Sequence, residues 1–480
     1  MSVHPREGVA ATAPARKGIG SLRAGSIGLA GVVFLVIATI APMSGTIGAL
    51  PLAFGLGTGA GTPGAFVVVA VVLLLFAVGY TAMSRHMATA GGFYVYIGEG
   101  LGLRAARAAG YLALLAYNVF QIAIWGTFGF FFNMFTGEWF GWDVSWIIWV
   151  LLGIGLVGVL GYFEIDVSAK VLGVCVVLEV LAILVMAFAI VFQGGADGLT
   201  LESFTPAAVT ADNLGIGLMF CFLLFIGFEA TAIYGEEARD PRRTIPRAAM
   251  FAVLIIAAFY VFVSWSLTIA YGFDDVRDAA ANDLGGFIFG AGREYVGPAQ
   301  VTIMELLFLV STFATVQGFH NAIARYSFSL ARDAWLPAAL GRTHPRHDSP
   351  FVASFLQTAV AAVVVLVFYI AGKDPYAEMF TWLIALGGVG LMLLMAVTSL
   401  AAIAFFRLRR VETGAWTTVI APVLAAAGLI VAVVLLIVNW DVQTAGAGGL
   451  IPYLPWLLLV PVLVGALWPV GARPSSWTVR

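Results

Sequence analysis

Long apolar stretches separated by short polar segments make up most of this chain. Twelve of the stretches are long enough to cross a bilayer as a helix, which takes about 20 residues. They cover residues 26–56, 64–84, 108–133, 145–162, 168–193, 213–235, 247–272, 299–329, 351–371, 377–406, 417–438 and 454–470. The pattern therefore predicts an all-α membrane protein with twelve transmembrane helices.

Composition supports the same class and excludes others. Hydrophobic residues make up 61% of the chain and charged residues only 10%, whereas ordinary soluble domains have about 25% charged residues. We therefore expect membrane lipid around the protein and no nucleic acid partner. Cys175 and Cys221 both lie inside apolar stretches, which argues against a disulfide or a metal site. The sequence contains no metal-spaced His/Asp/Glu cluster, nucleophile elbow or phosphate-binding loop, so we expect no enzyme activity, metal or cofactor.

The distribution of basic residues predicts the orientation. If the amino terminus is cytoplasmic and the spans alternate, only Arg277, Arg293 and Lys373 fall on the outer side, and all other Lys and Arg are cytoplasmic. An error of one span would destroy this segregation. We therefore predict a multi-pass protein of the plasma membrane, the inner membrane of a bacterium, with cytoplasmic tails at residues 1–25 and 471–480.

Two of the predicted helices, the first and the sixth, carry helix-breaking residues at mid-membrane. The first contains ATIAPMSGTIGALPL at 38–52, in which Pro42, Gly45 and Gly48 cluster, and the sixth contains FIGFEAT at 225–231. Backbone freed from helical hydrogen bonds is tolerated in a membrane only where it lines a cavity. Matching breaks five helices apart indicate inverted repeats with a substrate site between them. We predict repeats at 26–193 and 213–406, with helices eleven and twelve at 417–470 outside them.

Broken helices also predict the kind of ligand. The amino end of a half-helix offers unpaired N–H groups to a carboxylate, and the carbonyls at an opposing end accept bonds from an ammonium group. Close packing between helices is the other common reason for glycine in such a segment. Because both breaks occur at matching positions, we interpret them as a receptor for a zwitterion.

Three motifs resemble one known family, the superfamily of amino acid, polyamine and organocation transporters. Within this superfamily, the chain resembles an amino acid permease. They are GFEATAIYGEEARDPRRTIPRA at 227–248, AGGFYVYIGEGLG at 90–102 and NAIARYSFSLARDAWLP at 321–337. They occur in the family's order, and the resemblance extends over nearly the whole chain. It implies the leucine-transporter fold, a 5+5 inverted repeat followed by two further helices.

The resemblance also implies site residues. We expect the substrate carboxylate to be bound by Ser44, Gly45 and Thr46. We expect the substrate amine to be bound by the backbone carbonyls of Ala41, Leu223 and Ile226. Gly227 lets a ligand approach the backbone. Gln121 corresponds to a polar contact in some relatives, and Phe319 or His320 to an aromatic gate. Leu223 occupies the position where some arginine and polyamine exchangers have a tryptophan. This difference argues against the substrates of those exchangers for this chain.

Two carboxylates within the spans are candidates for coupling transport to an ion. An unpaired charge at membrane depth costs about 2.5–3.5 kcal/mol even on the lenient insertion scale, so Glu229 and Glu179 should face protein, water or cargo. Glu229 resembles the family's proton-sensing glutamate, although a carboxylate bonded to backbone is the alternative. Glu179 lies at or near the position where proton-driven members of the family have a lysine. It can be a proton acceptor, a cation ligand or a neutral buried carboxyl. Ser311 and Thr312 resemble a hydroxyl pair that ligates sodium in the wider fold.

The sequence thus predicts a secondary active transporter for an amino acid or a related amine, working by alternating access around a central site. Proton coupling is the preferred hypothesis. Sodium symport and exchange of amines or amino acids remain alternatives, as do a channel and a non-transporting sensor. Amino acids rank above polyamines because a polyamine has no carboxylate to use the N–H groups of Ser44 and Gly45.

Overall fold

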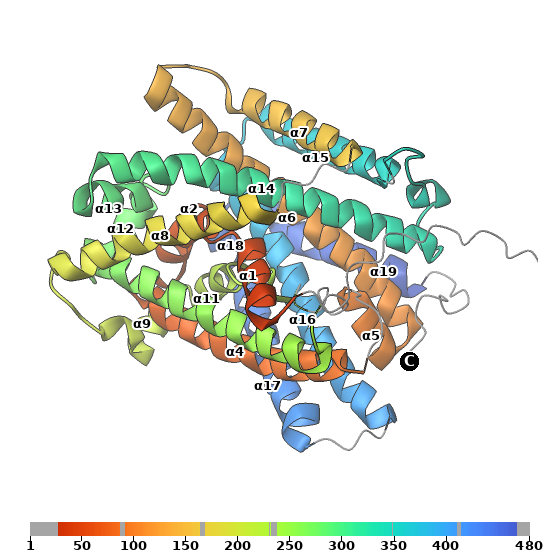
Figure 1. Cartoon of the computed structure of the whole chain (residues 1–480). Helices are drawn as coiled ribbons and strands as arrows, with labels where there is room; N and C mark the ends of the chain where they lie inside the picture. Colours follow the sequence, from red (N-terminus) through yellow and green to blue (C-terminus); the bar gives the residue numbers. More distant parts are fainter. Residues whose placement is uncertain are drawn as a thin grey trace, which may run out of the picture.

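A computed structural model describes residues 27–86, 92–163, 169–229, 231, 238–347, 349–409 and 414–467. All its regular elements are helices (Figure 1): α1 (Leu29–Ile40), α2 (Pro42–Gly48), α3 (Leu50–Leu52), α4 (Thr62–Ser84), α5 (Phe93–Leu101), α6 (Leu103–Phe140), α7 (Trp146–Tyr162), α8 (Ala169–Gln193), α9 (Pro206–Thr210), α10 (Leu214–Leu223), α11 (Pro241–Tyr271), α12 (Val276–Asn282), α13 (Phe287–Tyr295), α14 (Pro298–Arg332), α15 (Phe351–Ile370), α16 (Thr381–Arg409), α17 (Ala421–Val438), α18 (Trp440–Gln443) and α19 (Leu459–Leu467). Short 3-10 or π-helical turns add η1 (Ala53–Thr58), η2 (Gly59–Gly61), η3 (Glu202–Phe204), η5 (Ala338–Gly341), η6 (Pro375–Phe380), η7 (Trp416–Ile420) and η8 (Ile451–Leu458). The predicted tails at 1–25 and 471–480 lie outside the described residues.

The helices agree with the predicted membrane segments. Among the described residues, nine helical segments are long and apolar enough to cross a bilayer: Leu29–Gly48, Leu50–Ser84, Leu103–Phe140, Gly173–Gln193, Arg242–Tyr271, Pro298–Arg332, Phe351–Ile370, Pro375–Arg409 and Trp416–Val438. Three shorter apolar helices follow Trp146–Tyr162, Leu214–Leu223 and Ile451–Leu467. Together these segments overlap all twelve predicted stretches. The prediction of an all-helical, multi-pass membrane protein is confirmed.

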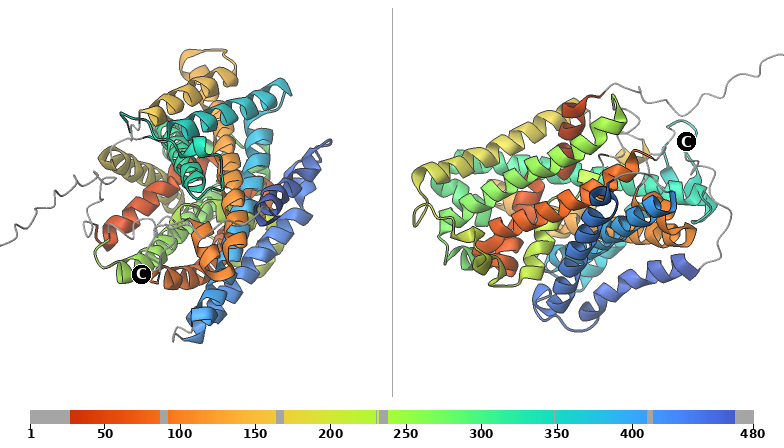
Figure 2. Two further views of the ribbon diagram at one scale, coloured as in Figure 1. Left: turned by 90° about the vertical axis from the view of Figure 1, so that its right-hand side faces the viewer. Right: turned by 90° about the horizontal axis from the view of Figure 1, so that it is seen from below.

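The helices form a bundle around the first interrupted helix. α2 lies inside the molecule and contacts α8 and α14, while α1 packs against α8 and α11. α7 and α15 lie side by side at one edge of the bundle, and α17 and α19 lie on another side (Figure 2). The interior therefore holds the broken segment, and unbroken helices separate it from the surrounding lipid.

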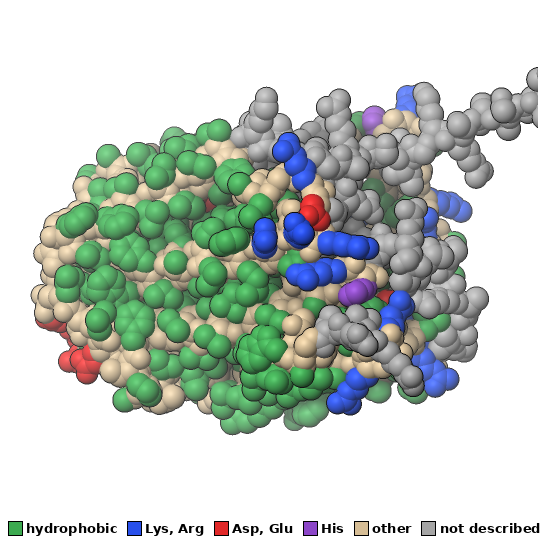
Figure 3. Space-filling view, turned by 60° about the horizontal axis from the view of Figure 1, so that its bottom comes forward, with side chains coloured by type: hydrophobic (Ala, Val, Ile, Leu, Met, Phe, Trp, Pro, Cys, Tyr) green, Lys and Arg blue, Asp and Glu red, His purple; other side chains and the backbone are tan. Residues whose placement is uncertain are grey.

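Charge divides the molecule into two ends. Figure 3 shows Lys and Arg side chains gathered toward one end, with hydrophobic side chains covering the long surface between the ends. A surface with an apolar band and a basic end is typical of a protein whose band lies in the hydrocarbon of a bilayer. The arrangement agrees with the charge segregation in the sequence.

Glycines allow η1, which follows the first interrupted helix, to pack closely against α10, which precedes the second interruption. A Cβ atom on Gly57 of η1 would lie 2.7 Å from the Cα of Gly217 on α10, and one on Gly217 would lie 2.7 Å from Cγ2 of Thr58. Side chains of any size would separate these backbones. This close packing holds the segments after the first break and before the second break against each other.

Candidate functional site

The first break lies at Ala41, between α1 and α2. Ala41 has φ 51° and ψ 72°, in the left-handed region, and Pro42 opens α2. A proline disfavours helical geometry in the residue before it and supplies no N–H group. The prediction that the break extends through Pro42, Gly45 and Gly48 is therefore wrong in its position, because residues 42–48 form a helix and the interruption precedes them.

The second break follows α10 and faces the first one. α10 ends at Leu223, the chain turns through 224–227, and Gly227 has φ +115°. A Cβ atom on Gly227 would lie 3.1 Å from Cγ1 of Ile40 and 3.3 Å from Cγ2 of Thr39. The predicted interruption of the sixth helix is thus confirmed, and its glycine packs directly against the last residues of α1.

Gly45 provides space for two side chains from other helices. A Cβ atom on Gly45 would lie 2.5 Å from Cδ2 of Leu224 and 2.7 Å from the hydroxyl of Tyr260 on α11. Tyr260 is fully buried. Leu224, at the second break, therefore reaches the first half-helix only because residue 45 has no side chain. Tyr260 could not be predicted, because in the sequence it is one aromatic residue within an apolar span.

Glu179 is a residue of α8 whose carboxyl group lies at the amino end of α2. Its Oε2 atom accepts a hydrogen bond of 3.4 Å from the Met43 N–H and one of 3.0 Å from the Ser311 hydroxyl. The carboxyl is 2% exposed, and among the described residues it forms no ion pair with Lys or Arg. Three helices, α2, α8 and α14, therefore meet at one buried carboxyl group.

The neighbouring predicted residues fall into the same region with different partners. Thr312 donates to the Ser44 hydroxyl at 3.4 Å, so Thr312 joins α14 to α2 while Ser311 joins α14 to α8. The Gly45 N–H donates to the Ala41 carbonyl at 3.1 Å, and the Thr46 hydroxyl donates to the Pro42 carbonyl at 2.7 Å. The N–H of Gly45 and the hydroxyl of Thr46 thus have partners within their own segment, while Ser44 and Gly45 are only half-buried.

Glu229 is bonded within the second break itself. Its Oε2 atom accepts a hydrogen bond of 2.8 Å from the Gly227 N–H, and its own carbonyl accepts one of 3.2 Å from the Tyr80 hydroxyl on α4. The Tyr117 hydroxyl on α6 lies beside the same carboxyl. These contacts hold the turn after α10 against α4 and α6. Ile226, the residue before Gly227 in this turn, is half-buried.

Gln121 is bonded to α14 and α15. Its amide donates to the Val316 carbonyl of α14 at 3.1 Å and accepts a short hydrogen bond from Gln357 on α15. His320 also faces α15, where its Nε2 atom lies 2.8 Å from the Ser354 hydroxyl. The structure therefore places Gln121 in a polar contact of α6 with α14 and α15, and His320 in a second contact between α14 and α15.

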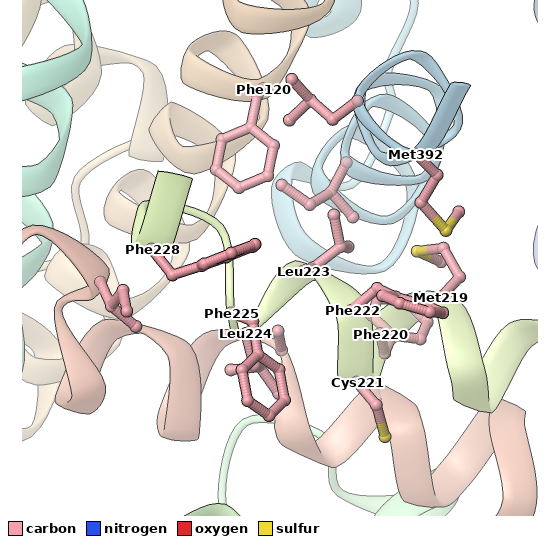
Figure 4. Close-up of a cluster of buried hydrophobic side chains, with 14 of the residues drawn as sticks. Phe120, Met219, Phe220, Cys221, Phe222, Leu223, Leu224, Phe225, Phe228 and Met392 are labelled. Atoms are coloured by element: carbon pink, nitrogen blue, oxygen red, sulfur yellow. The ribbon is translucent and has the colours of Figure 1, made fainter. Parts of the chain in front are cut away.

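Phe319 lies with aromatic residues near the second break. Its ring centroid is 4.9 Å from that of Phe120 and 6.1 Å from that of Tyr117, both on α6. Phe120, Leu223 and Phe228 belong to one cluster of buried hydrophobic side chains beside the break, together with Met219 and Met392 (Figure 4). The side chains drawn in this cluster carry only carbon and sulfur atoms. Phe120 was not predicted, because a phenylalanine in an apolar span has no distinguishing pattern.

Tyr376 of η6 closes the far end of α2. Its hydroxyl donates to the Gly48 carbonyl at 3.0 Å, and the side chain is 2% exposed. We expect Tyr376→Phe to lower the melting temperature of the purified protein in detergent, because a buried carbonyl left without its donor costs about 1–3 kcal/mol. Tyr369→Phe, at a residue that is 41% exposed, should cause little change. Equal melting temperatures for both variants would contradict this role.

Comparison with known proteins gives a consistent result. A family model described as amino acid permease matches residues 27–464. An uncharacterized transporter of Mycobacterium tuberculosis is 33% identical over 206 residues, which are 43% of this chain and 44% of that protein. The branched-chain amino acid permease BcaP of Bacillus subtilis is 24% identical over 334 residues, 64% of this chain and 69% of that protein. The match to the mycobacterial transporter thus spans less than half of its length.

A solved structure extends the likeness to the fold. The crystal structure of a manganese transporter mutant from Eremococcus coleocola superimposes with a TM-score of 0.56 at 12% identity, covering 92% of this chain and 94% of that one. At this identity the likeness concerns the fold alone. The leucine-transporter-like arrangement of the helices is therefore shared with a transporter of known structure.

Proposed function

The chain belongs to the amino acid permease family, and on this premise we propose that it carries an amino acid across the plasma membrane by alternating access. The main support is that the two interrupted helices meet at Gly227 and Ile40. Backbone groups released at such breaks suit the carboxylate and ammonium groups of an amino acid. The family consists of permeases, so the protein is a transporter and not an enzyme.

We propose for the fold twelve membrane crossings, with two inverted five-helix repeats and two further helices. Nine long and three shorter apolar helices supply enough segments within the described residues. The break at Ala41 falls in the first of these segments and the break at 224–227 directly follows the sixth, a spacing that supports an inverted repeat. The basic end of the molecule supports a cytoplasmic position for both termini, in a bacterial inner membrane.

For coupling we propose protons, with Glu179 and Glu229 as the groups that carry them. Glu179 supports this role best because it lies on α8 while its hydrogen-bond partners come from two other helices, α2 and α14. Movement of α2 relative to α14 would break these bonds and change the carboxyl group's surroundings. Glu229 is bonded to Gly227 of its own segment, so it responds to movement of the second break.

Sodium is the second candidate for the coupling ion, on one specific observation. The Glu179 carboxylate and the Ser311 hydroxyl lie 3.0 Å apart, and the Thr312 hydroxyl contacts Ser44 in the same region. Oxygen atoms from these residues could serve as ligands for a small cation. A proton and a sodium ion would thus use the same carboxyl group.

For the substrate we propose a neutral amino acid with an apolar side chain. The cluster of buried side chains beside the second break includes Phe120, Leu223, Phe228 and Met392, which offer no charge to a cationic or acidic side chain (Figure 4). Burying an unpaired charge among such residues is costly. The name of the relative BcaP, a branched-chain amino acid permease, supports the same substrate class.

Uptake into proteoliposomes tests the function. We expect the purified chain to take up radiolabelled leucine saturably, and faster when the outside is more acidic than the inside. Excess valine should compete, and excess lysine, glutamate or putrescine should not. Leucine binding without uptake would contradict transport, and uptake that does not saturate would indicate a channel.

The same assay separates the coupling alternatives. If protons drive uptake, replacing external sodium with choline should leave the rate unchanged, and uptake should not require leucine inside the vesicles. A loss of uptake in choline would indicate sodium coupling. Uptake that occurs only into preloaded vesicles would indicate an exchanger. A rate that does not respond to the pH gradient would overturn proton coupling.

A further inference from the structure

α7 and α15 enclose a groove at the edge of the bundle that the proposed transport site does not use. The groove has a volume of about 260 Å³. The residues that line it are Gly155, Gly158, Val159, Tyr162, Phe163, Phe351, Ser354, Phe355 and Thr358. Nothing lies within 4 Å of the position that a Cβ atom on Gly155 would take, so the missing side chain leaves open space. The groove lies between α7 and α15, two helices that run side by side (Figure 1).

The lining of the groove is suited to hydrocarbon. Its three side-chain hydroxyls already have partners: Ser354 is bonded to His320 at 2.8 Å, Thr358 donates to the Ser354 carbonyl at 3.0 Å, and Tyr162 is bonded to His344. The apolar lining residue Phe355 is strongly exposed, at 75%. In a membrane protein such residues face lipid tails. A polar ligand would find no unpaired hydroxyl here.

One end of the groove carries aromatic and basic residues. The Tyr162 hydroxyl lies 2.9 Å from Nε2 of His344, and the Phe163 ring centroid lies 5.1 Å from that of His347. Segment 342–347 also contains the exposed residues Arg342 and Arg346. The next residue in the sequence, Asp348, lies outside the described residues, and the two arginines that precede it outnumber it. By the orientation proposed above, this end faces the cytoplasm.

We propose that the groove binds an anionic glycerophospholipid, with an acyl chain between α7 and α15 and the phosphate beside Arg342 and Arg346. An apolar channel that ends at basic side chains on the cytoplasmic side matches the two parts of such a lipid, and basic pockets of this kind bind anionic head groups. Tyrosine and histidine at the mouth suit the interface between hydrocarbon and head groups.

The bound lipid would be connected to α14. Ser354 of the groove is bonded to His320, which lies on the same helix as Ser311 and Thr312. An acyl chain in the groove would therefore support α15 at its contact with the helix that holds the Glu179 partner. The lipid site itself depends only on the groove and its basic end, so its test does not require transport.

A photoactivatable phosphatidylglycerol with the reactive group on its acyl chain tests the site in the purified full-length chain. We expect crosslinks in peptides of α7 and α15 that include Val159 and Phe355. Excess unlabelled phosphatidylglycerol should suppress them about tenfold more effectively than phosphatidylcholine, a difference of about 1.4 kcal/mol. Crosslinks spread evenly over the apolar surface, or equal competition by both lipids, would overturn the proposal.

Variants separate the two parts of the site. Gly155→Leu fills the groove where no atom opposes a Cβ atom, so it should fold normally and lose the crosslink. The double variant Arg342→Gln/Arg346→Gln should keep the crosslink and lose the preference for phosphatidylglycerol. The matched control Arg242→Gln/Arg247→Gln, at exposed residues of α11, should keep both. A wild-type crosslink in a Gly155→Leu protein of unchanged melting temperature would contradict the acyl-chain position.

Discussion

Glu179→Gln is expected to abolish the stimulation of uptake by a pH gradient. A glutamine amide oxygen can still accept the hydrogen bonds from the Met43 N–H and the Ser311 hydroxyl, so the junction of α2, α8 and α14 should be preserved. The amide cannot take up or release a proton, however. We therefore expect gradient-driven uptake to fall about tenfold or more, which corresponds to about 1.4 kcal/mol or more. Exchange of internal for external leucine, which needs no net proton movement, should continue.

The matched control for this variant is Glu305→Gln. Glu305 is also a buried carboxyl on a membrane helix, 3% exposed, but its partner is the Trp139 indole at 3.0 Å and it lies away from both breaks. This variant should keep the response to the gradient. If Glu179→Gln responds to the gradient like the wild type, Glu179 does not carry the coupling proton. If both responses disappear together, the effect is a general one of removing buried carboxyls.

The fold was largely predictable because membrane helices follow from the sequence alone. A span needs about 20 apolar residues, and hydropathy detects such stretches directly. The position of the first break was less predictable. Pro42 and the glycines of 38–52 marked the correct segment, but helical geometry resumed at Pro42 itself, and the interruption fell on Ala41. Alanine carries no local signal for a left-handed conformation, and the proline that follows disfavours helical geometry without selecting the left-handed region.

The site was predictable only where the residue type is unusual for its surroundings. Glu179 and Glu229 stood out because carboxyls are rare in apolar spans, and Gly227 because it interrupts a helix. Gln121 is a polar residue in an apolar span in the same way, yet its partner is Gln357 on α15. A polar side chain in a span shows that a partner exists without identifying it. Aromatic residues such as Tyr260 and Phe120 carry no signal, because packing in three dimensions determines what they line.

The hydrogen bonds of the site also show why Glu179 could not be assigned from sequence. Glu179 and Met43 are separated by 136 residues, and Glu179 and Ser311 by 132 residues. Only the packing of α8 against α2 and α14 brings these groups together. Because each partner lies on a different helix, the carboxyl senses their relative positions, which is the property that coupling by alternating access requires.

Gly227→Val is expected to stop transport almost completely. Residue 227 has φ +115°, where a residue with a side chain loses about 1–3 kcal/mol in backbone strain. Its Cβ atom would also lie 3.1 Å from Cγ1 of Ile40, so the second break would have to move away from α1. Because Glu229 is bonded to the Gly227 N–H, its carboxyl would move as well. We expect leucine uptake to fall at least tenfold, measured in proteoliposomes with equal amounts of folded protein.

Gly102→Val separates backbone strain from the contact between the breaks. Gly102 has φ +89° and lies between α5 and α6, and nothing lies within 4 Å of the position of its Cβ atom. It should therefore lower the melting temperature in the same way as Gly227→Val but keep most of the uptake. If the two variants lose uptake equally, strain alone accounts for the loss. If Gly227→Val transports leucine like the wild type, the two breaks do not form the substrate site, because their contact could then be separated without effect.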